Sequence, residues 1–267
     1  MESTNALDQF LFGYYPYLCL AVFFAGSLIR YDREQYSWKS DSSQLLRHGT
    51  LRWGSNLFHI GALAILFGHI FGLLTPLSVW HALGVTPAMK QMTAIIAGAI
   101  AGSMAILGGL MLAARRLGDA RILATSQPMD IVILLLLIAQ LGLGLGSIPV
   151  SLQHTDGSEM LKLVDWAQRI WTFQPGAAAV IAGISIVFKL HLALGLTFFL
   201  LFPFSRLVHI WSGIASVVYL FRPYHLVRRR GERPSTESRP PVYRPFTPRV
   251  TAEPGSQVST EPLRKAA

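Results

Sequence analysis

Charged residues are scarce in this chain of 267 residues. They make up 14% of it, whereas hydrophobic residues make up 52%, and a soluble domain carries roughly 25% charged residues. The chain therefore has too little charge to cover the surface of a water-soluble protein of this size. The net charge of +9 does not indicate nucleic-acid binding, because the last 46 residues hold 10 Lys and Arg against 4 acidic residues and so contribute most of it.

Cysteine is also nearly absent. The single cysteine, Cys19, lies in an apolar run. An intramolecular disulfide and a CxxC-type metal or iron–sulfur site are therefore excluded.

Long apolar runs are abundant instead. A bilayer-spanning helix needs about 20 mostly apolar residues, and five segments meet this requirement: residues 11–29, 54–74, 92–113, 131–150 and 185–209. The first segment has no signal-peptide cleavage site and is followed by an Arg-Tyr-Asp-Arg cluster, so we interpret it as a retained anchor. The sequence thus predicts an all-α integral membrane protein, a bundle of five transmembrane helices.

Lys and Arg are distributed unequally between the two sides of these spans. Nineteen follow the first, third and fifth spans, and four lie on the other side: Lys90, Lys162, Arg169 and Lys189. Because cytoplasmic loops are enriched in Lys and Arg, we expect the N-terminus outside and the C-terminus in the cytoplasm. Residues 1–230 are expected to form the membrane domain. Residues 231–267, rich in Pro, Ser, Thr and Arg, are expected to form a disordered cytoplasmic tail.

Four of the eight histidines lie inside the predicted spans. They are His59 and His69 on the second span and His191 and His209 on the fifth. Ionisable groups at membrane depth are costly and mark functional sites. His59 and His69 are about 15 Å apart along a straight helix, and His191 and His209 are about 27 Å apart. Two histidines of the same span therefore cannot bind the same metal. In a bis-histidine b-type haem, the iron binds one imidazole on each face of the porphyrin ring. Two such haems would use all four histidines.

The direction of the spans determines how the histidines pair. The second span enters from the cytoplasm and the fifth from outside, so His59 pairs with His209 on the cytoplasmic side. His69 pairs with His191 on the outer side. The two separations are unequal, and Pro203 is expected to kink the fifth span between its histidines.

Glycines recur on one face of the second span and of the third. On the second span they are Gly54, Gly61, Gly68 and Gly72, and on the third they are Gly98, Gly102 and Gly109. Close helix packing explains such stripes, and it is the preferred interpretation for the third span. Beside His69, glycines would also let a porphyrin or quinone ring approach.

Several stretches around these residues resemble one protein family. They read SNLFHIG around His59, GHIFGLLTP around His69, HTDGSEMLKLVDWAQ before the fifth span and FKLHLALGLTFFLLFPFSRLVHIWS around the last two histidines, with YPY and LIRYDREQYSW near the start. Over residues 11–230 the chain resembles the gamma subunit of the membrane-bound respiratory nitrate reductase. The resemblance implies a dihaem cytochrome b of the bacterial inner membrane that oxidises quinol on the outer side and passes electrons inward.

The resemblance also assigns roles to individual residues. It implies that the four histidines above are the axial ligands of two haems b. It implies a quinol pocket beside the outer haem, formed by Lys90 in the loop before the third span together with Gly68, Gly72 and His69. On chemical grounds Lys90 could equally be a lysine that reaches to the headgroups.

Two arginines at the cytoplasmic ends of the spans have simpler explanations. Arg206, three residues before His209, is a candidate partner for a haem propionate. A positive-inside anchor explains Arg206 without a haem, and it also explains Arg116.

The resemblance implies two partners on the cytoplasmic side, an iron–sulfur beta subunit and a molybdenum-containing alpha subunit, because the chain has no set of cysteines for an iron–sulfur cluster and no molybdenum-site motif. Two other interpretations remain open. One is the dihaem membrane subunit of a heterodisulfide- or sulfite-reductase-type complex. The other is a transporter or metal-ion channel lined by the four histidines, which would need converging imidazoles and a hydrophilic path.

Overall fold

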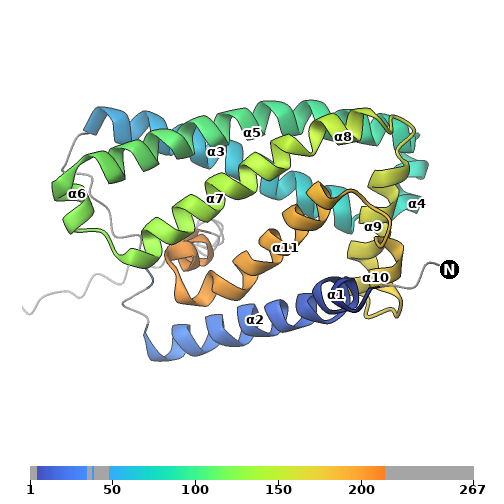
Figure 1. Cartoon of the computed structure of the whole chain (residues 1–267), viewed down its shortest axis with the longest axis horizontal. Helices are drawn as coiled ribbons and strands as arrows, with labels where there is room; N and C mark the ends of the chain where they lie inside the picture. Colours follow the sequence, from blue (N-terminus) through green and yellow to red (C-terminus); the bar gives the residue numbers. More distant parts are fainter. Residues whose placement is uncertain (1–4, 35–37, 39–47, 214–267) are drawn as a thin grey trace, which may run out of the picture. The chain divides into compact units, whose positions relative to one another are not determined.

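The computed structural model describes residues 5–34, 38 and 48–213. Regular structure in this part of the chain is helical throughout, without a strand (Figure 1). Five helical segments within it are long and apolar enough to cross a membrane: Ala6–Arg33, Gly49–Leu74, Pro87–Gly118, Pro128–Leu152 and Ile186–Phe204. The prediction of an all-helical chain with five spans is confirmed, and the chain is a multi-pass membrane protein.

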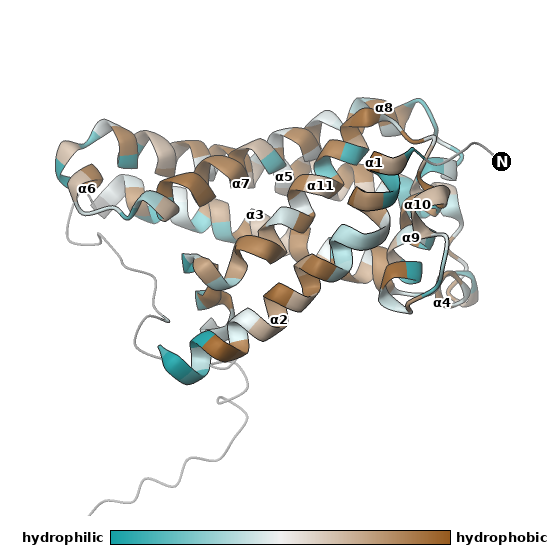
Figure 2. Cartoon of the chain, turned by 60° about the horizontal axis from the view of Figure 1, so that its bottom comes forward, coloured by the Kyte–Doolittle hydropathy of each residue, from teal (hydrophilic) through white to brown (hydrophobic). Residues whose placement is uncertain are grey.

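The elements follow one another in this order: α1 (Ala6–Gln9), η1 (Phe10–Tyr14), α2 (Tyr15–Arg33), α3 (His48–Leu74), α4 (Leu77–Ala82), α5 (Pro87–Gly118), α6 (Ala120–Ala124), α7 (Pro128–Gly146), α8 (Ile148–Leu152), α9 (Ser158–Trp171), α10 (Ala177–Val180), α11 (Ile186–Leu201), η3 (Phe202–Phe204) and η4 (Arg206–Val208). In Figure 2 the long helices are mostly brown, and α2 becomes teal where it ends in Arg30 and Arg33.

Proline and side-chain caps determine where several helices begin. Pro87 occupies the first position of α5, where its missing N–H is not needed, and the Thr86 side chain accepts a hydrogen bond from the Met89 N–H. Pro128 likewise occupies the first position of α7, where no side chain caps the helix. Asp119 has an extended backbone that ends α5, and its side chain caps α6. Helix α5 therefore begins five residues before the span predicted at 92–113.

Helices α3 and α5 form the most extensive helix–helix contact among the described elements. Small residues line this contact. A Cβ atom added to Gly61 would lie 2.5 Å from the Ala101 carbonyl oxygen and 2.6 Å from the Ala105 nitrogen. Gly54 also faces α5, where an added Cβ atom would lie 3.1 Å from Met111 Cβ and 3.4 Å from the Gly108 carbonyl oxygen. The two backbones can approach this closely only because side chains are absent there.

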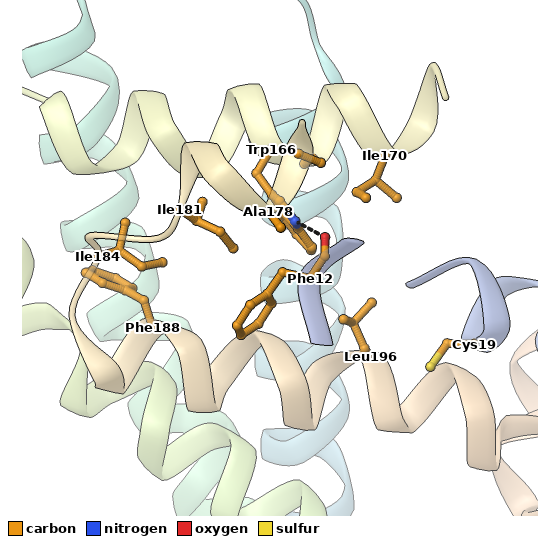
Figure 3. Packing of buried hydrophobic residues seen from close by; sticks show 11 residues of the cluster. Phe12, Cys19, Trp166, Ile170, Ala178, Ile181, Ile184, Phe188 and Leu196 are labelled. Atoms are coloured by element: carbon orange, nitrogen blue, oxygen red, sulfur yellow. Dashed lines mark hydrogen bonds between the residues drawn. The ribbon is translucent and has the colours of Figure 1, made fainter. Parts of the chain in front are cut away.

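A second packing unit joins the first and last spans through the segment between α7 and α11. Helix α2 packs against α11, and α9 and α10 cover one end of that pair. Figure 3 shows the buried side chains that meet there, including Phe12, Ile181 and Leu196. The Trp166 indole N–H donates to the Phe12 carbonyl oxygen at 3.0 Å, so the one polar atom of that ring is satisfied inside the apolar cluster.

The fifth span differs from the continuous segment predicted over 185–209. Helix α11 ends at Leu201, and two 3₁₀ turns follow, separated by Ser205 with an extended backbone. Pro203 lies in the first turn, where it has no N–H to continue an α-helix. The Arg30 guanidinium of α2 donates to the carbonyl oxygens of Pro203 and Ser205 at 2.7 and 2.9 Å. At the position of the expected kink, the α-helix therefore ends, and an arginine from the first span holds the turns that follow.

The chain divides into two units, Met1–Phe221 and Arg222–Ala267. The first contains every described residue. The predicted domain boundary after residue 230 and the predicted disordered tail lie outside the described residues.

Candidate functional site

The four histidines of the spans form two separate pairs. The ring centres of His59 and His209 are 6.3 Å apart, and those of His69 and His191 are 6.0 Å apart. These are the pairs expected from the direction of the spans. Within the described residues, no group of three or more His, Cys, Asp or Glu side chains converges as a single-metal site would require.

The separation within each pair fits two axial ligands of one metal. Metal–imidazole bonds are about 2 Å long and each nitrogen lies about 1 Å from its ring centre, so two ligands on opposite faces have ring centres about 6 Å apart. Both pairs have this spacing. Bis-histidine haem is the group whose ligand set is two imidazoles, one from each face.

Three of the histidines are oriented by backbone carbonyls. Nδ1 of His59, His69 and His209 lies 2.7, 2.8 and 2.6 Å from the carbonyl oxygens of Ser55, Ile65 and Arg206, respectively. A ring whose Nδ1–H is donated in this way keeps its Nε2 lone pair free for a metal. The orientation of these three side chains therefore fits their predicted role as haem ligands.

His191 is oriented differently. Its Nδ1 is buried without a hydrogen-bond partner among the described residues. Its Nε2 lies 3.4 Å from the side-chain nitrogen of Gln140 on α7, which also donates to the His191 carbonyl oxygen at 3.1 Å. Gln140 is not among the residues predicted from the sequence, even though a lone amide within the apolar run of α7 is a signal that could have identified it.

The glycines of α3 serve two different purposes. Gly54 and Gly61 face α5, as described above. A Cβ atom added to Gly68 or Gly72 would meet no other atom within 4 Å, so these two glycines are not needed for helix packing. They lie on either side of His69 in the chain, and the space beside them is open.

On α5, Gly102 faces Leu145, and Gly109 faces Ile138 and Phe58. Packing therefore explains these two members of the second stripe. Gly98, like Gly68, has no atom within 4 Å of an added Cβ.

The helices that carry the histidines pack against different neighbours. Helix α3 packs mainly against α5, whereas α11 packs mainly against α2 and α7. His59 and His69 are exposed, although they lie in an apolar helix. An uncovered imidazole is costly at membrane depth, so a group that lies between the two histidines of each pair would remove this cost.

Lys90 lies in the first turn of α5 and not in the loop where the sequence predicted it, because Thr86 and Pro87 begin the helix earlier. The side chain does not reach a solvent-exposed position. Lys90 is 7% exposed, and its Nζ is buried without a hydrogen-bond partner among the described residues. The ammonium lies 5.1 Å from the ring centre of Trp80, a distance at which the aromatic face attracts it.

Lys90 and His69 lie at the same end of the α3–α5 pair. His69 is near the end of α3, and Lys90 follows the short segment that contains α4. Gln91 holds the start of α5 to the end of α8 and the residues that follow it, because its side-chain nitrogen donates to the carbonyl oxygens of Ser151 and His154 at 2.7 and 2.6 Å.

Arg206 is part of a charged cluster near the other pair. Its guanidinium lies 3.8 Å from an Asp130 carboxylate oxygen, and Arg116 lies 3.4 Å from the same oxygen. Arg206 also orients His209 through its carbonyl oxygen. One carboxylate thus faces two guanidinium groups near His209. Asp130, which the sequence analysis did not consider, gives Arg116 and Arg206 a role beyond that of independent anchors.

Comparison with known proteins identifies the family. The model of the nitrate reductase gamma subunit family matches residues 8–230. The chain is 50% identical over 227 residues to the respiratory nitrate reductase 2 gamma chain of Escherichia coli (strain K12), covering 84% of this chain and 98% of that protein. It is 50% identical over 224 residues to the respiratory nitrate reductase 1 gamma chain of the same organism, with the same shares of the two chains.

A more distant relative agrees. The nitrate reductase gamma chain of Bacillus subtilis (strain 168) is 37% identical over 222 residues, which cover 83% of this chain and 98% of that protein. The resemblance proposed from the histidine motifs is therefore confirmed over most of the chain, and with it the expectation of a membrane-bound oxidoreductase subunit in the electron transport of nitrate respiration. The chain belongs to the nitrate reductase gamma subunit family.

Proposed function

We propose that this chain is the quinol-oxidising cytochrome b subunit of a respiratory nitrate reductase in the bacterial cytoplasmic membrane. It takes electrons from quinol near the outer face and passes them through two haems b to an iron–sulfur beta subunit on the cytoplasmic face. A molybdenum-containing alpha subunit then reduces nitrate, because this chain holds no ligands for such a centre. The chain also anchors these subunits to the membrane.

The two histidine pairs carry this proposal. Each has the ring separation that two axial ligands need, 6.3 Å for His59–His209 and 6.0 Å for His69–His191. The two haems would supply one-electron transfer across the bilayer. The chain itself would hold them, with three of the four imidazoles fixed by backbone carbonyls. Arg206, which lies three residues before His209, is a candidate hydrogen-bond donor to a propionate of the inner haem.

The quinol site is proposed at the His69–His191 end. Lys90 offers a buried ammonium without a hydrogen-bond partner among the described side chains, and a quinol oxygen is an acceptor that would satisfy it. A hydrogen bond from a cation also favours loss of the hydroxyl proton. Gly68 and Gly72 leave the backbone of α3 open to the ring.

The distribution of Lys and Arg supports the orientation. With 19 of the 23 basic residues on one side of the spans, the N-terminus lies outside and the His59–His209 pair lies towards the cytoplasm. Quinol oxidation then releases two protons outside, while the two electrons move inward. The step would therefore contribute to the membrane potential.

Haem content tests the proposal. The complex is purified, its haem is quantified by pyridine haemochrome, and reduction by a quinol analogue is followed in the reduced-minus-oxidised spectrum. We expect two haems b per chain. His69→Ala should remove the outer haem and quinol-dependent reduction while the haem at His59–His209 remains. His59→Ala should remove the inner haem.

The matched control is His81→Ala on α4, a histidine outside both pairs, which should leave both haems in place. One haem in the wild-type chain would show that one pair is assigned wrongly. A well-folded preparation without haem, from cells that make haem, would refute the proposal and favour a histidine-lined transporter.

A further inference from the structure

A single amide lies in the apolar part of α7. Apart from Asp130 in the first turn, Gln140 is the one polar side chain among the 19 residues of this helix. A polar group at membrane depth costs free energy unless its hydrogen bonds are satisfied. The contacts of Gln140 should therefore explain its presence.

Gln140 contacts the residue of α11 that carries a proposed haem ligand. Its Nε2 donates to the His191 carbonyl oxygen at 3.1 Å and lies 3.4 Å from the His191 Nε2. Two glycines make room for this contact. A Cβ atom at Gly195 of α11 would lie 3.1 Å from Gln140 Nε2, and one at Gly144 of α7 would lie 3.1 Å from His191 Cε1. Each helix thus has a glycine opposite the polar side chain of the other.

Two buried atoms at this contact have no hydrogen-bond partner within the described part of the chain. They are Gln140 Oε1, an acceptor, and His191 Nδ1. When Nε2 of a histidine is bound to a metal, Nδ1 carries the proton and becomes a donor. The other three histidines give this proton to a backbone carbonyl. For His191 the structure shows no such carbonyl within the described residues, and Gln140 Oε1 is a buried acceptor without a partner on the side chain that contacts this imidazole. The nitrogen that faces Gln140 in the structure is Nε2, so binding of Nε2 to iron requires the ring to turn until Nδ1 faces Gln140.

We propose that Gln140 is the positioning residue of the outer haem: its amide oxygen accepts the Nδ1–H of His191 when Nε2 of His191 is bound to iron, and its N–H holds the His191 carbonyl. This inference rests on the haem assignment proposed above. An acceptor on the second nitrogen fixes the orientation of a ligating imidazole and makes it more basic. A more basic imidazole favours ferric iron, so removing the acceptor should make the outer haem easier to reduce.

The test compares the intact complex carrying Gln140→Leu with the complex carrying Gln140→Glu, which keeps an acceptor oxygen. Both haems are titrated against ambient potential, and the low-spin EPR signals of the two ferric haems are recorded. In Gln140→Leu, the ratio of reduced to oxidised outer haem at a fixed potential should rise about tenfold, equivalent to about 59 mV for one electron. Its EPR signal should also move. In Gln140→Glu the potential should stay at or below the wild-type value.

Two controls isolate the effect. The inner haem is an internal control, and its potential should not change in either variant. Thr197→Val removes a hydroxyl from the same helix, α11, where it contacts Ala193 and Tyr15, and it should leave both haems unchanged. If Gln140→Leu does not assemble, Gln140→Met, which is closer in length, replaces it.

The inference would be wrong if the outer haem kept its potential and EPR signal in the apolar variant. An equal shift of both haems, or a rise in Gln140→Glu as large as in Gln140→Leu, would also overturn it, because general loosening of the bundle would then explain the effect. A wild-type chain without the outer haem would instead contradict the proposed function.

Discussion

Lys90 is a charged side chain placed where its charge is not neutralised. It is 7% exposed, and the face of Trp80 is the contact that the structure gives its ammonium. A lysine that only anchored α5 at the interface would extend towards the headgroups. Burial without a hydrogen-bond acceptor among the described residues instead agrees with the proposed contact to a quinol oxygen.

Lys90→Met should therefore weaken quinol oxidation without loss of haem. Losing a hydrogen bond to a charged group costs about 1.5–3 kcal/mol, so kcat/KM for a quinol analogue should fall roughly 10- to 100-fold. Lys162→Met is the matched control, because Lys162 is paired with Glu159 at 2.8 Å on α9. Unchanged kcat/KM in Lys90→Met would remove Lys90 from the quinol site.

For single residues, the sequence predicted the candidate site residues better than it predicted the contacts that these residues make. The four histidines stood out because imidazoles are rare in apolar runs, and the direction of the spans gave their pairing. Lys90 was placed in a loop, although Thr86 and Pro87 carry a helix-start signal. The contacts of Gln140 depend on how α7 meets α11, which local sequence does not specify.

Among the helices, α3 is the element on which both histidine pairs depend. It carries one histidine of each pair, and its position is set by the backbone contact of Gly61 and Gly54 with α5. A glycine stripe in sequence does not distinguish glycines that pack from glycines that face open space. The structure separates Gly61, which packs, from Gly68, which does not.

Gly61→Ala should push α3 away from α5. An added Cβ would lie 2.5 Å from the Ala101 carbonyl oxygen, and overpacking of this kind costs about 1–3 kcal/mol. The thermal unfolding midpoint of the complex should fall by several degrees, and the spectra of both haems should broaden. Gly98→Ala is the control, since an added Cβ there meets nothing within 4 Å. Equal stability of the two variants would contradict the role given to the α3–α5 contact.

The end of the fifth span shows the limit of sequence-based prediction for an element. Pro203 indicated a break, but not the path of the chain beyond it. That path is determined by Arg30, which lies more than 170 residues earlier and binds two carbonyl oxygens in the turn. In the sequence, Arg30 is only one of the basic residues that follow the first span. In the structure it also holds the turn before His209, whose ring centre lies 6.3 Å from that of His59.

For the whole molecule, the functional residues and the family match lie in the same part of the chain. The match ends at residue 230, and the last proposed ligand is His209. Hydropathy gave the five spans, because apolar runs of this length have few alternatives. The orientation and the partner subunits rest on charge distribution and on the family, respectively.

Deleting residues 231–267 should leave two haems per chain and unchanged quinol-dependent nitrate reduction, because every proposed ligand and contact precedes the deletion. Haem content, nitrate reduction and co-purification of the partner subunits are the measurements. Loss of the partner subunits from the truncated complex would show that the tail takes part in assembly.

The pairing of α2 with α11 has a consequence for biosynthesis. The first span packs against the last, so a nascent chain that ends before residue 186 lacks the main partner of α2 and holds only one histidine of each pair. Helices α3 and α5 are close in sequence and can associate while synthesis continues. If two haems bridge α3 and the fifth span, as proposed, their binding sites are complete only after the residues up to His209 have been synthesised.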